Sequence, residues 1–124
     1  MKTPRKLLVI DDEPEIGEIV KDFLDEQGYI TLLATDAKQG LALLEKEHPD
    51  IILLDILLPE IDGLECLEKI RQIDEKVIVV VASGLQDEQV AKKAIQKGAY
   101  DYILKPFDLS YLQNNILGRV FPNS

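Results

Sequence analysis

The segment Lys6-Leu7-Leu8-Val9-Ile10-Asp11-Asp12 carries the first signal of the architecture, because a short apolar run ends abruptly in two acids. Similar apolar runs follow at residues 29–34, 51–54, 77–82 and 100–104. Strands that are almost wholly apolar are covered on both faces, as in a parallel sheet between two layers of helices. The five runs therefore predict five buried parallel strands.

Amphipathic helical patterns separate these runs. The first begins at Pro14, which suits a first helical turn, and ends before Gly28. Its apolar residues share one helical face: Ile16, Ile19, Val20, Phe23 and Leu24. Later patterns have apolar residues at Ala37, Leu41 and Leu44; at Leu64, Leu67 and Ile70; at Val90, Ala91, Ala94 and Ile95; and at Leu109, Leu112, Ile116 and Val120. Alternating strands and helices predict a doubly wound α/β fold with right-handed crossovers.

The composition favours one acidic domain. The chain has 124 residues, of which 46% are hydrophobic, and its formal net charge is −9. Such a charge repels phosphate backbones and anionic membrane surfaces, so direct nucleic-acid or membrane binding is not expected. A single cysteine, Cys66, and a single histidine, His48, form no disulfide and no thiolate or multi-histidine metal site, and neither is expected to carry chemistry. The absence of a long apolar run predicts a cytoplasmic protein.

Polar residues stand where four of the predicted strands end. Asp11 and Asp12 follow the first strand, Asp55 the third, Ser83 the fourth and Lys105 the fifth. The carboxyl ends of parallel strands lie along one edge of the sheet, where ligands bind. We therefore expect these side chains to meet in one pocket.

This set of residues favours phosphoryl transfer. Three carboxylates packed together repel one another, and one lysine does not neutralise them, so a divalent cation is expected. An all-oxygen ligand set with few carboxylates suits Mg²⁺. Phosphoryl transfer consists mainly of positioning and charge neutralisation, and an aspartate can itself be the nucleophile.

Four segments, in this order, resemble the receiver domain of bacterial two-component response regulators. They are Leu8-Val9-Ile10-Asp11-Asp12-Glu13, then Asp55-Ile56-Leu57-Leu58-Pro59-Glu60-Ile61-Asp62-Gly63, then Ala82-Ser83-Gly84, and Tyr102-Ile103-Leu104-Lys105-Pro106-Phe107. The spacings are 43 residues from Asp12 to Asp55, 28 to Ser83 and 22 to Lys105. The resemblance implies a flavodoxin-like sheet of order 2-1-3-4-5 with five helices on both faces. It also implies a single receiver domain over residues 1–124, in which residues 121–124 form a tail or the start of a linker.

The resemblance assigns the metal site and the phosphoacceptor. Asp55 matches the residue that accepts a phosphoryl group from a partner phosphohistidine. Asp12 matches the direct ligand of Mg²⁺, for which Mn²⁺ can substitute, and Asp11 the acid that reaches the metal mainly through water. The main-chain carbonyl of Leu57 matches the third protein ligand.

The resemblance also assigns the residues that respond to the phosphoryl group. Lys105 matches the lysine that pairs with the phosphoacceptor and then with the phosphoryl oxygens. Ser83 matches the switch hydroxyl and Tyr102 the switch aromatic. Pro106 matches a proline whose preceding peptide bond is cis.

By this resemblance the chain is a signalling phosphoacceptor that catalyses only its own phosphorylation and dephosphorylation. Its partners are a sensor histidine kinase or a histidine phosphotransfer protein, and a downstream output protein or domain. The surface formed by the fourth helix, fifth strand and fifth helix is expected to change on phosphorylation. Leu57 and Leu85 lie two residues after Asp55 and Ser83, and are expected to hinder the water that hydrolyses the phosphoryl group.

Three other interpretations remain open from the sequence. The chain could be the receiver of a multidomain transcriptional regulator. It could be a pseudo-receiver that only binds partners, although the complete acid, hydroxyl and lysine set disfavours this. It could be a small Mg²⁺-dependent phosphatase with an aspartyl-phosphate intermediate. Such an enzyme needs a second acid two residues beyond the nucleophile, where this chain has Leu57.

Overall fold

The computed structural model describes residues 4–122 and has five parallel strands in one sheet, ordered β2-β1-β3-β4-β5. The strands are β1 (Lys6–Ile10), β2 (Ile30–Ala34), β3 (Ile51–Asp55), β4 (Ile78–Ser83) and β5 (Asp101–Leu104). The sheet order and the parallel pairing confirm the predicted fold. Strands β2, β4 and β5 each begin one residue later than the apolar runs suggest, and β4 continues through Ser83.

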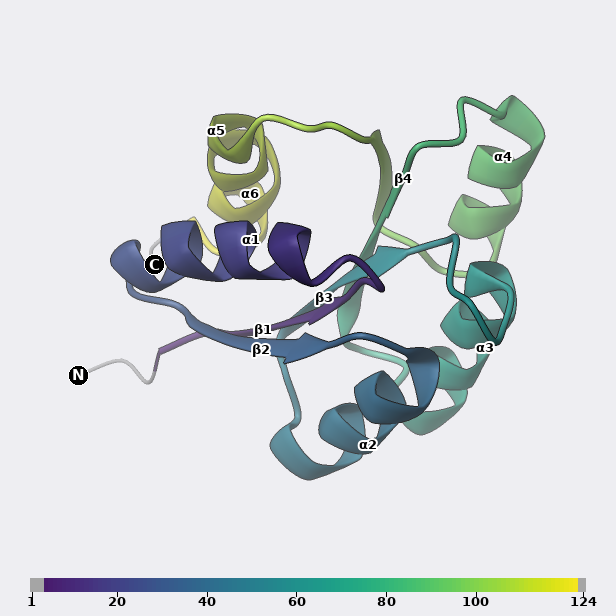
Figure 1. Ribbon diagram of the computed structural model, residues 1–124, viewed down its shortest axis with the longest axis horizontal. Helices are drawn as coiled ribbons and strands as arrows, with labels where there is room; N and C mark the ends of the chain where they lie inside the picture. Colours follow the sequence, from purple (N-terminus) through teal and green to yellow (C-terminus); the bar gives the residue numbers. More distant parts are fainter. Residues whose placement is uncertain (1–3, 123–124) are drawn as a thin grey trace.

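Helices cover both faces of the sheet (Figure 1). The first four are α1 (Pro14–Glu26), α2 (Ala37–Glu47), α3 (Gly63–Ile73) and α4 (Glu88–Gln96). The last predicted helix is a continuous helical segment in three parts: α5 (Leu109–Tyr111), the π-helical η1 (Leu112–Leu117) and α6 (Gly118–Val120). Helix α1 and this last segment lie on one face, and α2, α3 and α4 lie on the other. No helix within residues 4–122 is both long and apolar enough to cross a membrane.

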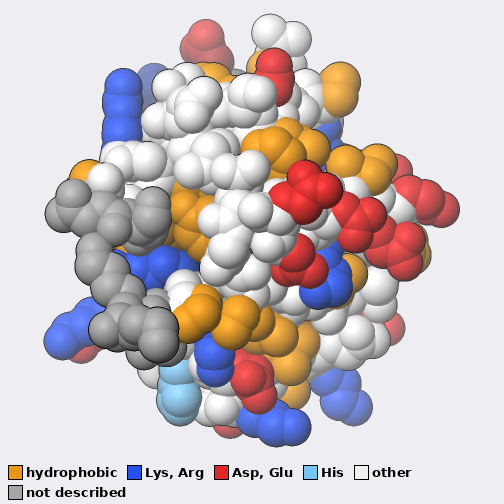
Figure 2. Space-filling view, turned by 90° about the vertical axis from the view of Figure 1, so that its left-hand side faces the viewer, with side chains coloured by type: hydrophobic (Ala, Val, Ile, Leu, Met, Phe, Trp, Pro, Cys, Tyr) orange, Lys and Arg blue, Asp and Glu red, His pale blue; other side chains and the backbone are white. Residues whose placement is uncertain are grey.

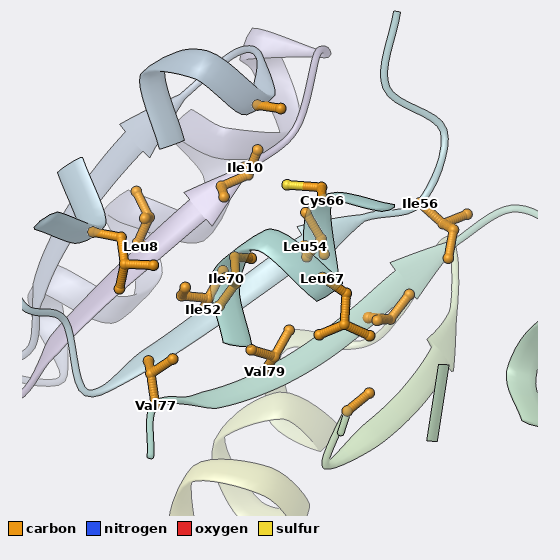
Figure 3. Packing of buried hydrophobic residues seen from close by; sticks show 14 of the residues in the cluster. Leu8, Ile10, Ile52, Leu54, Ile56, Cys66, Leu67, Ile70, Val77 and Val79 are labelled. Atoms are coloured by element: carbon orange, nitrogen blue, oxygen red, sulfur yellow. The ribbon is translucent and has the colours of Figure 1, made fainter. Parts of the chain in front are cut away.

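Two hydrophobic clusters fill the space on either side of the sheet. On the side of α2, α3 and α4, side chains from β1, β3 and β4 meet Cys66, Leu67 and Ile70 of α3 (Figure 3). On the other side, Val20 and Leu24 of α1 pack near the last helical segment. The strands are buried on both faces, as their apolar composition predicts.

The last helical segment differs from a regular amphipathic helix. Leu112, Ile116 and Leu117 are all buried, whereas Val120 is only partly buried. The π-helical stretch spans Leu112 to Leu117, and it brings both Ile116 and Leu117 into the core. Phe121 is also buried in this cluster, so the folded part includes it, while Asn123 and Ser124 of the expected tail lie outside the described residues.

Helix α4 is attached more weakly than its apolar pattern suggests. Only Ala94 of α4 is buried. Ile95, expected on the covered face, is 48% exposed, and Val90 and Ala91 are partly buried. The helix ends in a turn at Gly98, whose φ of +104° lies in the region that glycine adopts without strain.

Candidate functional site

The ends of β1, β3 and β4 and the residue after β5 converge at one edge of the sheet. Ile10 of β1 is in register with Leu54 of β3, so Asp11 and Asp55 stand side by side as the next residues along each chain. The next pairings bring the end of β4 beside β3 and Lys105 beside Ser83, whose carbonyl accepts a hydrogen bond from the Lys105 amide at 2.8 Å. Parallel pairing alone therefore gathers residues that are far apart in sequence.

Lys105 binds two of the predicted acids directly. Its Nζ lies 2.6 Å from Asp11 Oδ2 and 3.1 Å from Asp55 Oδ2. A third acid, Glu13, has Oε1 at 3.6 Å. The side chains of Lys105, Asp11 and Asp55 are only 11%, 6% and 5% exposed, so water screens these ion pairs weakly. The lysine is thus the counter-charge that two buried carboxylates require.

A backbone hydrogen bond fixes the other oxygen of each buried carboxylate. Asp11 Oδ1 accepts a hydrogen bond from the Glu13 amide at 2.9 Å. Asp55 Oδ1 accepts one from the Leu57 amide at 3.0 Å. Asp11 follows β1 and Asp55 ends β3, and each carboxylate accepts a hydrogen bond from the amide two residues further on, as aspartate often does in a turn. Each carboxylate therefore has one oxygen hydrogen-bonded to a backbone amide and the other bonded to the Lys105 ammonium.

Burial and charge shift two pKa values at the site. Desolvation raises the pKa of Asp55 above its ordinary value, and the nearby Asp11 charge raises it further, against the Leu57 amide and Lys105, which lower it. Desolvation alone would lower the pKa of Lys105, but its bonds to Asp11 and Asp55 outweigh this, and the net shift is upward. Lys105 therefore stays protonated at neutral pH.

The raised pKa of Lys105 predicts a loss of stability in alkali. A cation whose pKa is higher in the folded state stabilises the fold below its unfolded pKa of 10.5, and this contribution disappears as the pH rises through the folded value. We expect the free energy of unfolding of the wild type to fall more steeply above pH 10.5 than that of Lys105→Met, measured by urea denaturation. Lys92→Met, which changes an exposed lysine, is the control and should retain the wild-type slope. Equal slopes in all three proteins would contradict the role of Lys105.

The acids at this edge form a candidate cation site. One carboxylate oxygen from each of Asp11, Asp12, Glu13 and Asp55 lies within 4.8 Å of the others. Asp12 and Glu13 are exposed, whereas Asp11 and Asp55 are buried. This all-oxygen set fits a hard divalent cation. Glu13 was not predicted as a site residue, although its position directly after Asp11-Asp12 was a signal for it.

Leu57 lies in the loop between β3 and α3, beside the acids. Besides the hydrogen bond from its amide to Asp55, it forms an isolated antiparallel bridge with Asp62. Its side chain is 53% exposed. Gly63, the first residue of α3, donates its amide to the Ile56 carbonyl at 3.0 Å and closes this loop. The backbone of Leu57 is thus held close to Asp55 while its side chain faces solvent.

Ser83 and Tyr102 both bind Leu85, in the loop that leads to α4. The Leu85 amide donates to Ser83 Oγ at 3.0 Å, and the Tyr102 hydroxyl donates to the Leu85 carbonyl at 2.7 Å. Ser83 is fully buried and Tyr102 is partly buried. All four residues of the loop from Gly84 to Asp87 are exposed, Leu85 included. Both predicted switch residues therefore contact the same loop residue.

A cleft of about 690 Å³ opens above the acids. Its polar lining includes Asp12, Asp55 and Lys105, and its apolar lining includes Ile19 of α1 and Phe107 of the loop after β5. Pro106 also lines it, and the Lys105–Pro106 peptide bond is cis, as predicted.

Comparison with known proteins gives one consistent family. The model of the response regulator receiver domain matches residues 7–117. The chain is 37% identical over 110 residues to the probable C4-dicarboxylate response regulator DctR of Bacillus subtilis, covering 87% of this chain and 49% of that protein. It is 30% identical over 111 residues to the sporulation initiation phosphotransferase F of Bacillus subtilis, covering 90% of each. The chain spans about half or less of the length of the first four curated relatives.

Solved structures share the fold closely. A CheY-like response regulator receiver domain protein from Methanospirillum hungatei has a TM-score of 0.91 at 29% identity, covering 95% of this chain and 94% of that one. The receiver domain of NtrX from Brucella abortus has a TM-score of 0.85 at 36% identity, covering 95% and 99%.

Proposed function

This chain belongs to the family of response regulator receiver domains of two-component signalling systems, and we propose that Asp55 is its phosphoacceptor. The observation that carries the proposal is the Lys105 ammonium 3.1 Å from Asp55 Oδ2, within the cluster of acids. A carboxylate of raised pKa is a better nucleophile than an ordinary one, provided that a cation keeps it ionised. Lys105 supplies that cation.

The reaction is a direct displacement. A carboxylate oxygen of Asp55 forms a bond to phosphorus as the bond between phosphorus and the partner's imidazole nitrogen breaks. The imidazole leaves with the bonding electron pair and takes up a proton. Lys105 then pairs with oxygens of the phosphoryl group, whose charge of about −1.5 to −2 exceeds that of the carboxylate it replaces. Asp11 keeps the lysine close to the site through the second ion pair.

Asp12, Asp11, Asp55 and the Leu57 carbonyl would hold Mg²⁺, with Mn²⁺ as a substitute. The carboxylate donors at this edge fit such a cation. When bound, it neutralises charge on the phosphoryl oxygens, which is the main chemical requirement of the transfer. Lys105 alone cannot balance the four neighbouring acids.

The experiment is phosphorylation of the purified protein. We expect incubation with Mg²⁺ and acetyl phosphate to add one acid-labile phosphoryl group, detected by intact mass. EDTA should prevent the addition. Failure to gain this mass with Mg²⁺ present, together with failure to bind beryllofluoride, would overturn the proposal.

The switch proposal starts from the shared contact of Ser83 and Tyr102 with Leu85. A phosphoryl oxygen attracts the Ser83 hydroxyl, in a charge-assisted bond worth about 1.5–3 kcal/mol. Full inversion of a two-state equilibrium takes about 5.5 kcal/mol, so Lys105 and the cation must contribute as well. A movement of Ser83 pulls on Leu85 and hence on Tyr102 and the start of α4.

Exposed apolar side chains on α4, β5 and α5, namely Ile95, Leu104 and Tyr111, support an output-partner surface there.

Ser83→Ala tests this switch. We expect the variant to accept the phosphoryl group, because Asp55 and Lys105 are intact, but to show a reduced response at α4. The measurement is amide hydrogen exchange of residues 84–92 with and without Mg²⁺ and beryllofluoride. A response equal to that of the wild type would discard the role of Ser83.

Leu57→Asn tests control of the phosphoryl lifetime. The exposed Leu57 side chain lies beside Asp55 and lines the cleft, where an apolar group disfavours an attacking water. An amide at this position can hydrogen-bond that water, so we expect hydrolysis of the aspartyl phosphate several-fold faster. The decay of phosphorylated protein, followed by intact mass, measures the rate. An unchanged rate would contradict the effect.

The partner that donates the phosphoryl group is a sensor histidine kinase or a histidine phosphotransfer protein. The exposed face of α1 is strongly acidic, with Glu15, Glu18, Asp22, Asp25 and Glu26. On the face drawn in Figure 2, several acidic side chains gather on the right-hand part of the view. This charge supports a protein partner rather than direct binding of nucleic acid by this domain, and a cytoplasmic setting fits the kinase partner.

The output is a separate protein or a further domain of the same regulator. The greater length of the first four curated relatives supports the second arrangement, that of a multidomain transcriptional regulator. The mass of the full-length gene product tests it. A mass equal to that of this chain would contradict the multidomain arrangement and would mean that the output partner is a separate protein.

A further inference from the structure

Arg71, in the last turn of α3, binds three main-chain carbonyls, two in the loop between α3 and β4 and one in the turn after α4. Its Nη1 donates to Val77 O at 2.5 Å and to Asp74 O at 3.4 Å, and its Nη2 donates to Gly98 O at 2.6 Å. Asp74 is the residue after α3, Val77 is the residue before β4, and Gly98 lies in the turn after α4. One partly buried guanidinium thus joins α3 to the C-terminal end of α4, at the opposite end of α4 from Ser83.

The turn after α4 is shaped to receive this arginine. A Cβ on Gly98 would lie 2.7 Å from Arg71 Nε and 3.2 Å from its Cδ, so a larger residue would displace the side chain. The guanidinium therefore lies directly against the glycine backbone. Close by, Lys97 forms an ion pair with Glu68 of α3. That pair is exposed, and pairs of this kind contribute little.

The two ends of α4 are held differently. Its C-terminal end has the Arg71 bond, and Ala94, its single buried residue, lies in its last turns. Its N-terminal end follows the exposed loop that contacts the rest of the protein through Leu85. An element with few buried contacts moves most readily where it is least held.

We infer that Arg71 is a positioning residue that anchors the C-terminal end of α4, so that α4 swings about that end when its N-terminal end moves. This inference rests on the proposed function of Asp55, because phosphorylation supplies the movement at Ser83 and Leu85. The anchor directs the response into the surface at the start of α4. Without the bonds of Arg71, phosphorylation changes both ends of α4.

Hydrogen exchange of the free protein and of the protein with Mg²⁺ and beryllofluoride tests the anchor. In the wild type we expect beryllofluoride to change exchange in residues 84–92 and to leave residues 96–100 unchanged. In Arg71→Ala we expect exchange in residues 96–100 to be about tenfold faster without beryllofluoride, and to change when it is added. Arg71→Lys keeps the positive charge but not the planar guanidinium. Exchange in its residues 96–100 should be intermediate between that of the wild type and that of Arg71→Ala.

Two controls separate anchoring from general loss of stability. Arg119→Ala removes an exposed arginine and should behave as the wild type. Lys97→Met removes the exposed ion pair and should have little effect. A merely structural role of Arg71 would speed exchange throughout the protein and leave the pattern of the beryllofluoride response intact, which would overturn the inference.

The outcomes also distinguish this inference from the proposed function. If beryllofluoride changes residues 55–62 but affects residues 84–92 and 96–100 of the wild type equally, only the anchor is wrong. If beryllofluoride changes no segment, the proposed function fails and the anchor is discarded with it.

Discussion

We expect replacement of Asp55 by Asn to abolish phosphorylation of this protein by acetyl phosphate. The amide occupies the same volume but is not a nucleophile, so the rate of incorporation should fall by several orders of magnitude. The neighbouring acids are not expected to substitute for it, because Asp11 and Asp12 are the proposed ligands of the cation. Intact-mass measurement after incubation with Mg²⁺ and acetyl phosphate gives the result directly.

The matched control is Asp22→Asn, which changes an exposed acid of α1. It should be phosphorylated at the wild-type rate. A phosphoryl group that appears on Asp55→Asn at more than a small fraction of the wild-type rate would assign the acceptor to another residue.

Asp55→Asn should also fold without loss of stability. Its loss of phosphorylation would then reflect the missing nucleophile and not an unfolded protein. Desolvation raises the pKa of Asp55 above its ordinary value of 3.8. A carboxyl group with a raised pKa destabilises the folded state once the pH exceeds the unfolded value, because its ionised form is disfavoured there. The neutral amide removes this cost, so the free energy of unfolding at pH 7 should be no lower than that of the wild type. A large decrease would mean that the ion pair with Lys105 outweighs the desolvation.

The sequence predicted the convergence of the site because that convergence depends on strand ends alone. Asp11, Asp55, Ser83 and Lys105 each follow an apolar run, and parallel pairing is enough to bring them to one edge. The sheet order and the cis bond before Pro106 came from the resemblance, and the structure confirms both.

Features that depend on packing between distant segments were not predictable from local patterns. The sequence did not indicate that Lys105 binds Asp11 at a shorter distance than Asp55, because side-chain rotamers decide this. Nor did helical periodicity indicate that Ile95 stays exposed, because α4 packs against the rest of the protein mainly through Ala94, its one buried residue. Arg71 was missed for the same reason, since its three acceptors are backbone carbonyls that no sequence motif displays.

Replacement of Gly63 by Ala should destabilise the protein and distort the site together. A Cβ at Gly63 would lie 2.4 Å from the Cα of Ile56 and 2.6 Å from its carbonyl oxygen. These are backbone atoms of the residue next to Asp55, so a change of rotamer cannot relieve the clash. We expect a loss of about 3 kcal/mol, at the upper end of the usual cost of overpacking, and a fall in Tm of roughly 10 °C.

The same substitution should weaken cation binding in the protein that still folds. The displaced Ile56 backbone leads directly to Leu57, whose amide binds Asp55 and whose carbonyl is a proposed ligand. Gly17→Ala is the matched control, because its Cβ would meet only side-chain atoms of Leu33, at 3.3 Å and beyond, and alanine favours the helix. Thermal unfolding and Mg²⁺ titration of both variants measure the two effects. Since the glycine clash acts on the backbone between Asp55 and the start of α3, a Gly63→Ala protein that kept wild-type stability and Mg²⁺ affinity would show that this loop does not shape the site.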